Sequence, residues 1–452
     1  MENPYSIRET SIDYRDSRNI AFFEYLCVFI LIIYAGRSNK FVESGLITIK
    51  NLGVFIPIIL SIILAIKWKI KFDGYFFLLT FGFFIYFVAI SIKFQEIHPS
   101  FFLTYFFNYF NAYIIIKVLK RNLFKTYENI IFYLAIAGLL LWCIQIVLGG
   151  DTLYNMLSKL NPMDFSSVTG NGKTAIIYSV QPSDFSLLYG FTIPRNCGYA
   201  WEPGVFAVFL CLAIFINLFI TSTDKKSKMK LWVLIITLLS TLSTTGYVIF
   251  LVIITYYLLN KKLNIIILLF PLAIVAMIYL SSLPFMSKKV FQVMDETKQV
   301  DDLLEATYGV DFQSNPQRFT SIMISLKDFA ENPILGIGGN NTGSWTYKVG
   351  SRISTASGLG NLLAQFGSIG FIFFIIASFK SSHYFSTYYN YKGKFLLFLI
   401  ILLLSVSYSI IFLPIIMTFW TYQLFGPDMP SEEEGSNFAL KTNNNERIPL
   451  NH

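Results

Sequence analysis

The feature that most constrains this sequence is a series of apolar runs, each about as long as a lipid bilayer is thick. A span needs about 20 mostly apolar residues to cross ~30 Å of hydrocarbon. Only 14% of the residues are charged, against about 25% in soluble proteins. The sequence therefore predicts an all-α polytopic integral membrane protein with about 12 transmembrane helices. The expected spans are 19–36, 46–66, 74–93, 100–117, 129–148, 203–222, 231–242, 245–259, 263–282, 357–379, 394–408 and 410–425.

Lysine and arginine set the expected orientation. They are concentrated in alternate short loops, such as 67–71, 117–125 and 224–230, and basic loops stay in the cytoplasm. Both termini are therefore expected there, and the net charge of +8 reflects topology, so no nucleic-acid partner is expected. The predicted organisation is a cytoplasmic N-terminus 1–18, spans 1–5 in 19–148, a first large periplasmic loop 149–202, spans 6–9 in 203–282, a second large periplasmic loop 283–356, spans 10–12 in 357–425, and a disordered cytoplasmic tail 426–452.

Two apolar stretches are too long for one span and predict pairs of short helices. Residues 231–259 contain STLSTTGYV, and residues 394–425 contain SVSYS followed by Pro414. Non-helical backbone at such breaks is tolerated where it faces protein or water.

The second large loop is expected to form a helical lid. Asn315 and Pro316 are a helix-start pattern. The following residues place Phe319, Ile322, Met323, Leu326 and Phe329 on one apolar face. A glycine-rich stretch, 334–344, then offers backbone that can approach a ligand closely.

Arg195 and Glu202 are the first candidate functional residues. They stand just before the apolar run that starts at Pro203, with Tyr199 between them. One interpretation is structural: a glutamate that caps a helix, an interfacial arginine and a tyrosine of the aromatic belt. The other is chemical: an arginine that binds phosphate and a carboxylate that acts as a base at the membrane surface.

Arg318 is the candidate in the second loop, on the first turn of the lid helix. Its planar guanidinium suits a pyrophosphate and keeps its charge, although a solvated role is the alternative. Lys348 and Arg352 could add positive charge at the far end of the same loop. Asn361 and Gln365, one helical turn apart, could bind sugar hydroxyls or make interhelical hydrogen bonds.

Other polar residues favour no specific chemistry. Lys93, Glu96 and His98 share a short loop, where the histidine is a proton carrier or a surface residue. Glu24 in the first span must reach an interface or pair with a neighbour. The cysteines and histidines have no ligand spacing, and no nucleotide-binding motif is present, so neither a metal nor a cofactor is expected.

Three segments together resemble the bacterial O-antigen polymerase and ligase superfamily. RNCGYAWEPGVFA (195–207) resembles its Arg-x-x-Gly-x-x-x-Glu-Pro-Gly stretch. NPQRFTSIMISLKDFAENPILGIGGNN (315–341) resembles its second large periplasmic loop, and STASGLGNLLAQFGSIGFIFF (354–374) resembles the span that follows. The resemblance covers roughly 190–380.

This resemblance implies a GT-C-like fold in the bacterial inner membrane and a metal-independent transfer of glycan from undecaprenyl pyrophosphate. It implies catalytic roles for Glu202 and Arg318. The expected substrate-binding residues are Arg195, Tyr199, Asn340, Arg352, Asn361 and Gln365. The implied partners are an undecaprenyl-pyrophosphate-linked oligosaccharide, membrane lipid and, by analogy alone, a chain-length regulator.

Three activities remain open at the level of sequence. A polymerase, which joins lipid-linked repeat units, is preferred. Ligases of the superfamily carry a functional histidine in the second large loop, and residues 283–356 contain none. A flippase for lipid-linked glycans is the third alternative, although no internal repeat typical of transporters is apparent.

Overall fold

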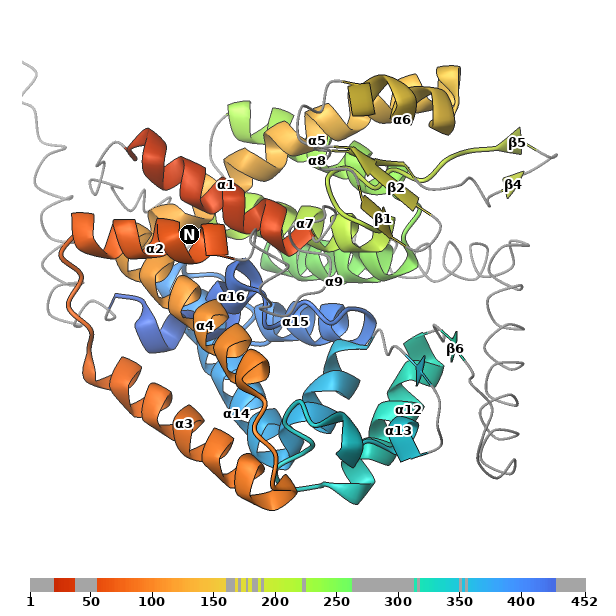
Figure 1. The fold of residues 1–452 in the computed structure, drawn as a ribbon. Helices are drawn as coiled ribbons and strands as arrows, with labels where there is room; N and C mark the ends of the chain where they lie inside the picture. Colours follow the sequence, from red (N-terminus) through yellow and green to blue (C-terminus); the bar gives the residue numbers. More distant parts are fainter. Residues whose placement is uncertain are drawn as a thin grey trace, which may run out of the picture.

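The chain folds into a bundle of apolar helices with two groups of smaller elements at one end (Figure 1). The computed structural model describes residues 20–36, 55–159, 167–169, 172–175, 178–180, 186–187, 191–221, 225–261, 313–314, 318–348, 352–353 and 357–427. The helices before the first group are α1 (Phe22–Gly36), α2 (Phe55–Lys67), α3 (Gly74–Phe94), α4 (Pro99–Leu119) and α5 (Asn122–Leu148). The later helices of the bundle are α7 (Pro203–Ile216) with its π-helical extension η2 (Asn217–Thr221), α8 (Lys225–Ser240), α9 (Thr244–Asn260), α14 (Gly358–Tyr388), α15 (Leu396–Ser407) and α16 (Pro414–Phe425).

Helix α7 is the centre of the bundle. Every residue from Pro203 to Ile216 is buried, and α5, α8 and α9 all pack against it. A helix that is apolar on all sides must be surrounded by other helices. The residues that precede and follow α7 are therefore held in fixed positions.

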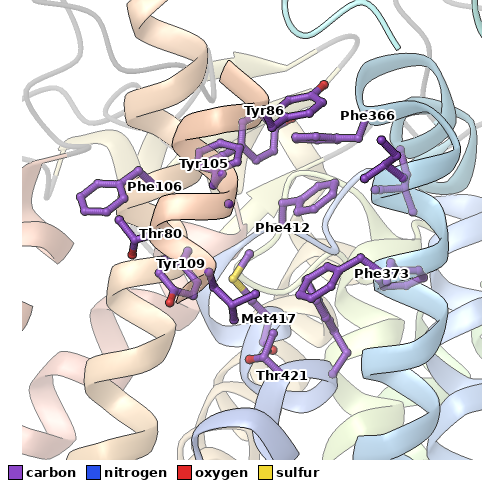
Figure 2. A pocket seen from close by; sticks show the side chains of 18 of the residues that line it. Thr80, Tyr86, Tyr105, Phe106, Tyr109, Phe366, Phe373, Phe412, Met417 and Thr421 are labelled. Atoms are coloured by element: carbon purple, nitrogen blue, oxygen red, sulfur yellow. The ribbon is translucent and has the colours of Figure 1, made fainter. Parts of the chain in front are cut away.

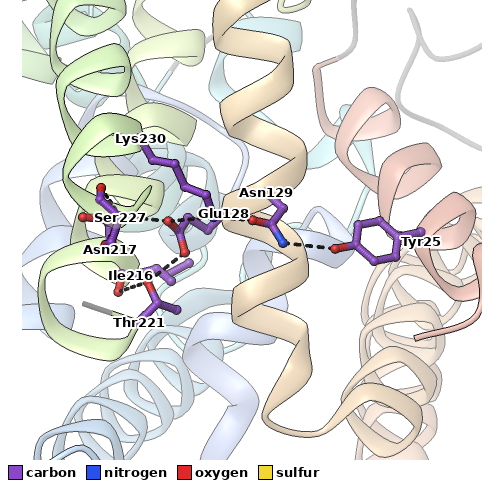
Figure 3. A network of polar contacts seen from close by, with 8 residues as sticks. All are labelled: Tyr25, Glu128, Asn129, Ile216, Asn217, Thr221, Ser227 and Lys230. Atoms are coloured by element: carbon purple, nitrogen blue, oxygen red, sulfur yellow. Dashed lines mark hydrogen bonds and ion pairs between the residues drawn. The ribbon is translucent and has the colours of Figure 1, made fainter. Parts of the chain in front are cut away.

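A buried polar network holds the far end of α7 (Figure 3). The Glu128 carboxylate, 1% exposed, accepts hydrogen bonds from Asn217 Nδ2 and Thr221 Oγ1, both at 2.8 Å. Lys230 Nζ lies 3.6 Å from the same carboxylate. Asn217 and Thr221 belong to η2, and π-helical turns inside helices commonly mark such side-chain insertions. A buried carboxylate needs these partners, because an unpaired charge in an apolar interior is costly.

The membrane character is plain in the helices. Five of the described helices are long and apolar enough to cross a bilayer: α3, α4, α5, α7 with η2, and α14. Four shorter apolar helices, α1, α2, α9 and α15, accompany them. The chain is a multi-pass helical membrane protein, and the count of 12 spans stays a prediction. The expected span 263–282 lies outside the described residues.

Both breaks expected from the sequence are present. Helix α8 ends at Ser240 and α9 begins at Thr244, with the Ser243 hydroxyl accepting from Gly246 N at 3.2 Å. Helices α15 and α16 are separated by residues 408–413, most of which are buried in protein. Buried surroundings let this non-helical backbone exist between apolar helices.

The expectation of an all-α protein is wrong in the first large loop. This loop contains α6 (Gly150–Lys159) and five short strands. They are β1 (Ser167–Thr169), β2 (Gly172–Ala175) and β3 (Tyr178–Val180) in one antiparallel sheet, and β4 (Ser186–Leu187) with β5 (Phe191–Thr192) in a second pair. Strands of two to four residues carry too little alternation of polar and apolar residues to be recognised in a sequence. The sheet is tied to α5 by the Tyr178 hydroxyl, which donates to Gln145 Oε1 at 2.6 Å.

The second group of elements belongs to the second large loop. It comprises β6 (Gln313–Ser314), α12 (Arg318–Glu331), the short turn η3 (Asn341–Gly343), α13 (Trp345–Lys348) and β7 (Arg352–Ile353), which pairs in parallel with β6. The expected N-cap, Asn315, lies outside the described residues.

The glycine-rich segment 333–339 fills a kink in α14. Gly367 has φ 61° and ψ −160°, which breaks the helix. The N–H groups of Ile337 and Gly338 donate to the carbonyls of Ala364 and Gln365, at 2.8 and 2.9 Å. In return, the N–H groups of 368 and 369 donate to the carbonyls of 333 and 334. The loop thus satisfies the four backbone groups that the kink would leave unpaired.

The predicted apolar face of the lid helix is wrong. Met323 and Leu326 are 41% and 39% exposed, whereas Ser321 and Ser325 are fully buried. Helix α12 packs its small polar side against α14, where Gly360 allows Ser325 to approach closely. Small residues favour close packing between helices in a membrane, and apolar side chains can face lipid. The hydrophobic pattern therefore indicated the outward face of this helix.

We expect Gly367→Ala to destabilise the folded protein by roughly 1–3 kcal/mol, the cost of one strained backbone position. An added Cβ would lie 2.3 Å from the carbonyl oxygen of Ile334, and φ is positive there. The measurement is the thermal unfolding midpoint in detergent. Gly74→Ala is the control, because a Cβ at Gly74 meets nothing within 4 Å. Equal midpoints for the two variants would contradict the role of the kink.

Candidate active site at the converging helix starts

Three helix N-termini meet around Tyr408, in the connection between α15 and α16. A Cβ added at Gly204, at the start of α7, would lie 1.5 Å from the Tyr408 hydroxyl oxygen and 3.3 Å from the Ser243 hydroxyl, which caps α9. A Cβ at Gly358, at the start of α14, would lie 2.2 Å from the Tyr408 carbonyl oxygen. Helix N-termini carry partial positive charge, so negative charge is favoured where several of them meet.

Arg195 lies beside this cluster. Its Nε donates to the carbonyl of Thr241 at 3.1 Å, in the break between α8 and α9. The next residue, Asn196, is buried and donates through Nδ2 to Ser240 Oγ at 2.9 Å, while its Oδ1 accepts from Gly198 N at 3.0 Å. The segment 195–198 is therefore fixed to the end of α8, and Arg195 is held half-buried.

Glu202 occupies the N-cap position of α7, with extended φ and ψ of −144° and 142°. Its side chain makes no capping hydrogen bond to the helix, so the simplest structural interpretation of this glutamate does not apply. Its backbone carbonyl accepts from Val205 and Phe206, as an N-cap residue does. The half-buried carboxylate thus stands at the positive end of the central helix, where negative charge is stabilised.

The Cys197 thiol lies between Arg195 and Glu202 in the sequence and is influenced by the charge of each. Burial raises the pKa of the Cys197 thiol, Arg195 lowers this pKa, and Glu202 raises it further, so both charges act on one sulfur atom. The thiol also donates to the carbonyl of Arg195 at 3.8 Å. A buried thiol with a raised pKa stays protonated near neutral pH and is a poor nucleophile. Cys197 is therefore a poor candidate for a reacting group at this site.

Three of the predicted substrate-binding residues make contacts within the protein. Tyr199 is 1% exposed and packs its ring against Phe206 and Phe209, which favours a packing role. Asn361 donates to Ser409 Oγ at 3.1 Å and so belongs to the helix-start cluster. The Gln365 Oε1 accepts from Gly339 N at 2.8 Å, which makes it part of the kink.

Asn340 and Lys93 lie where the glycine-rich segment meets α3. Asn340 is fully buried and its Oδ1 accepts from Thr342 N at 2.8 Å. Lys93, expected in a short loop, instead ends α3 and donates to Asn332 Oδ1 at 2.6 Å. His98 pairs with Glu96 at 3.2 Å on the surface. The bond between Lys93 and Asn332 fastens α3 to the second large loop. It is not part of the cluster around Arg195 and Glu202.

The backbone around Arg318 and Arg352 places both near the start of α14. Ser325 meets Gly360, and the Pro333 carbonyl accepts from Ser368 N, so α12 and the first part of α14 run in the same direction. Arg318, at the first residue of α12, is therefore at the end of this pair where α14 begins. Arg352 lies in β7, six residues before the first residue of α14.

Sequence reasoning missed Tyr408 and the serines beside it. Ser407 Oγ lies 2.8 Å from Thr245 Oγ1, and Ser409 binds Asn361. The break at SVSYS was recognised, but it gave no sign that its tyrosine would lie at the start of α7, 204 residues earlier in the chain. Only the packing of distant helices shows this.

The fold and this site define a multi-pass membrane protein with an anion-attracting centre at its helix starts. A family model described as O-antigen ligase matches residues 229–375, about a third of the chain. The matched part includes α8, α9, α12 and the kink of α14, but not Arg195 or Glu202. This match supports the resemblance of the chain to the O-antigen polymerase and ligase superfamily, whose members are glycan-transferring enzymes. No curated protein and no solved structure matches the chain.

We expect a membrane-permeant maleimide to modify Cys143 in the folded protein and to leave Cys197 unmodified. Cys143 is exposed, whereas Cys197 is buried and burial raises its pKa. Raising the pH moderately above neutrality should not make the Cys197 thiol reactive toward the maleimide, because its raised pKa keeps the thiol protonated. The measurement is mass spectrometry of labelled peptides, with Cys143→Ser as control and denatured protein as reference. Equal labelling of the two thiols would show that segment 195–198 is not held as described.

Proposed function

We propose that this protein is a polysaccharide polymerase that joins lipid-linked oligosaccharide repeat units. The donor is a glycan on undecaprenyl pyrophosphate, and the acceptor is a sugar hydroxyl of the next repeat unit. The observation that carries the proposal is the meeting of the α7, α9 and α14 N-termini beside Arg195 and Glu202. Such a centre suits a reaction in which a diphosphate leaves with negative charge.

The proposed reaction needs one charge-stabilising group and one base. The acceptor hydroxyl oxygen attacks the anomeric carbon of the donor, the bond from that carbon to the phosphate oxygen breaks, and the diphosphate leaves on its lipid. Arg195 and the helix N-termini stabilise the leaving diphosphate, with no metal assigned to this role. Glu202 accepts the proton of the attacking hydroxyl, for an expected contribution of ~10²–10⁴-fold.

Arg318 is proposed as a second cation for the diphosphate. Its support is the common direction of α12 and α14, which puts the first residue of α12 at the end of the pair where α14 starts. Asn361, bonded to Ser409 beside Tyr408, is proposed to position sugar hydroxyls. Arg352, in β7, is proposed to add positive charge near the start of α14.

We also propose the bacterial inner membrane as the location, with both termini in the cytoplasm. In that orientation the helix starts face the periplasm, where lipid-linked repeat units are joined in this superfamily. The support is the distribution of lysine and arginine among the loops. Lys225, for example, begins α8 and Lys392 precedes α15, both at the end opposite the proposed site.

A ligase is the second candidate, and the description of the matched family favours it. A ligase would transfer a finished glycan to a different acceptor through the same charge-stabilising centre. The absence of histidine from residues 283–356 favours the polymerase, because the superfamily's ligases use a histidine there. The two activities differ in their products, which can be separated by size.

The deciding experiment uses purified protein in lipid nanodiscs with the synthetic lipid-linked repeat unit of the source bacterium. We expect a ladder of products that differ by one repeat unit. Arg195→Ala and Glu202→Gln should each slow the ladder about 100-fold, the usual cost of losing one such group. The measurement is the initial rate of ladder growth on a gel.

Arg121→Ala is the matched control for these variants. Arg121 lies at the opposite end of the bundle, over the ring of Tyr388 at 4.4 Å, and its loss should leave the rate unchanged. If a single product forms, and only when a lipid acceptor is added, the activity is that of a ligase and not of a polymerase. Full activity in both site variants would refute the assigned site.

A further inference from the structure

Asn196, next to Arg195, is bonded through its backbone N–H and through both ends of its side-chain amide. It is fully buried. Its backbone N–H donates to the carbonyl of Ser240 at 3.0 Å, and its Nδ2 donates to Ser240 Oγ at 2.9 Å. Its Oδ1 accepts from Gly198 N at 3.0 Å, which closes a turn that asparagine side chains commonly form with the backbone two residues on. One side chain therefore shapes this segment and ties it to the end of α8.

The residues on either side of this asparagine are held as well. Arg195 Nε donates to the carbonyl of Thr241 at 3.1 Å, directly after α8. The carbonyl of Gly198 accepts from the N–H of Ser179, in β3, at 2.8 Å. The end of α8 and the sheet of the first large loop therefore both hold the segment 195–198.

The break between α8 and α9 presents fixed backbone carbonyls to this segment. Helix α8 ends at Ser240, and Leu242 has a φ of 47°, in the left-handed region that costs energy for a leucine. The Tyr247 hydroxyl, in α9, donates to the carbonyl of Leu239, in α8, at 2.7 Å and so bridges the break. The last carbonyls of a helix carry partial negative charge and have no partner within it. An arginine is a suitable partner for them.

The position of Arg195 matters for the proposed reaction. An arginine side chain has many rotamers, and ordering it costs entropy. A bond from Nε to a fixed carbonyl removes part of this freedom before the substrate arrives. Charge that is already in place need not rearrange as the leaving group departs, and a small displacement of such a group costs much of the rate.

We propose that Asn196 is a positioning residue that, together with the α8–α9 break, fixes the Arg195 guanidinium for the leaving diphosphate. The inference rests on the proposed function, because Arg195 is assigned to the diphosphate there. Asparagine suits this position chemically: aspartate has no N–H to donate to Ser240 and adds a negative charge next to Arg195, and serine has one polar atom for two partners. Because it is fully buried, Asn196 acts through Arg195 and not on the substrate.

Two variants test this role at different strengths. Asn196→Ala removes both side-chain bonds. Ser240→Ala is milder, because it removes only the acceptor of Asn196 Nδ2 and keeps the backbone bond and the turn to Gly198. If Asn196→Ala does not fold, Ser240→Ala alone decides the test.

Two control variants each remove one buried hydroxyl that is bonded to a helix carbonyl. Thr237 is one turn earlier in α8 and donates to the carbonyl of Val233 at 2.7 Å. Thr421 donates to the carbonyl of Met417 at 2.8 Å and lines an apolar cavity of about 340 Å³ between α3, α4, α14 and α16 (Figure 2). Neither side chain bonds the segment 195–198, so Thr237→Val and Thr421→Val should keep the wild-type rate.

The first readout is the rate of ladder growth on the synthetic lipid-linked repeat unit. We expect Ser240→Ala to lower kcat about tenfold and to change KM little, because a misplaced charge weakens the transition state more than substrate binding. In an Arg195→Ala background, Ser240→Ala should have no further effect, because nothing is left to position. A merely structural role would instead give additive losses and a lower unfolding midpoint.

The second readout is labelling of Cys197 by a maleimide, which needs no turnover. The thiol is fully buried in the wild type. Loosening the segment should admit the reagent, so we expect labelling in Asn196→Ala, weaker labelling in Ser240→Ala, and none in the two controls. Mass spectrometry of the labelled peptides measures it.

Two rate results would overturn the inference: a wild-type rate in Ser240→Ala, or a loss that adds to the loss in Arg195→Ala. If the wild type forms no ladder, the polymerase is refuted and the labelling decides this inference separately. Increased labelling of Cys197 in Ser240→Ala or Asn196→Ala would then support the positioning of Arg195, and unchanged labelling would refute it.

Discussion

The structure depends most on the hydrogen bonds between segment 333–339 and the broken turn of α14. A continuous helix would pair Ser368 N with the carbonyl of residue 364. The positive φ of Gly367 prevents this, and the loop takes both groups instead. The kink gives α14 two directions, so its first two turns can approach Tyr408 while its remainder crosses the bundle. The same bonds fix the end of α12 and, through Lys93, the end of α3.

The sequence was a good guide to where helices begin and break, because those signals are local. Pro203, Ser243 and Pro414 each act within one turn of themselves. It was a poor guide to the orientation of α12. In a soluble protein, Met323 and Leu326 would mark the buried face, but apolar side chains on a membrane protein can equally face lipid. The short strands of the first loop were missed because their pairing, and not their pattern, defines them.

For the candidate site, the local sequence identified the charged residues but not the helix starts and the tyrosine that surround them. Arg195 and Glu202 were found because they adjoin an apolar run, and both charges influence the Cys197 thiol between them. Tyr408 was not found in this way, because it comes close to Gly204 only when α7 packs against the connection between α15 and α16. Asn361 and Gln365 stand one turn apart on α14, and the segment 333–339 at the kink of α14 gives Gln365 a backbone partner.

The short length of α15 bears on how such a site could stabilise a diphosphate. A helix of 12 residues rises about 18 Å, short of the ~30 Å of hydrocarbon, and Lys392 and Lys394 precede it. Tyr408 therefore follows a helix too short to cross the hydrocarbon, and it is surrounded by buried side chains. Charges interact more strongly in such surroundings than in water. A half-buried arginine and three fixed helix dipoles can then supply, without reorganising, the stabilisation that a leaving diphosphate requires.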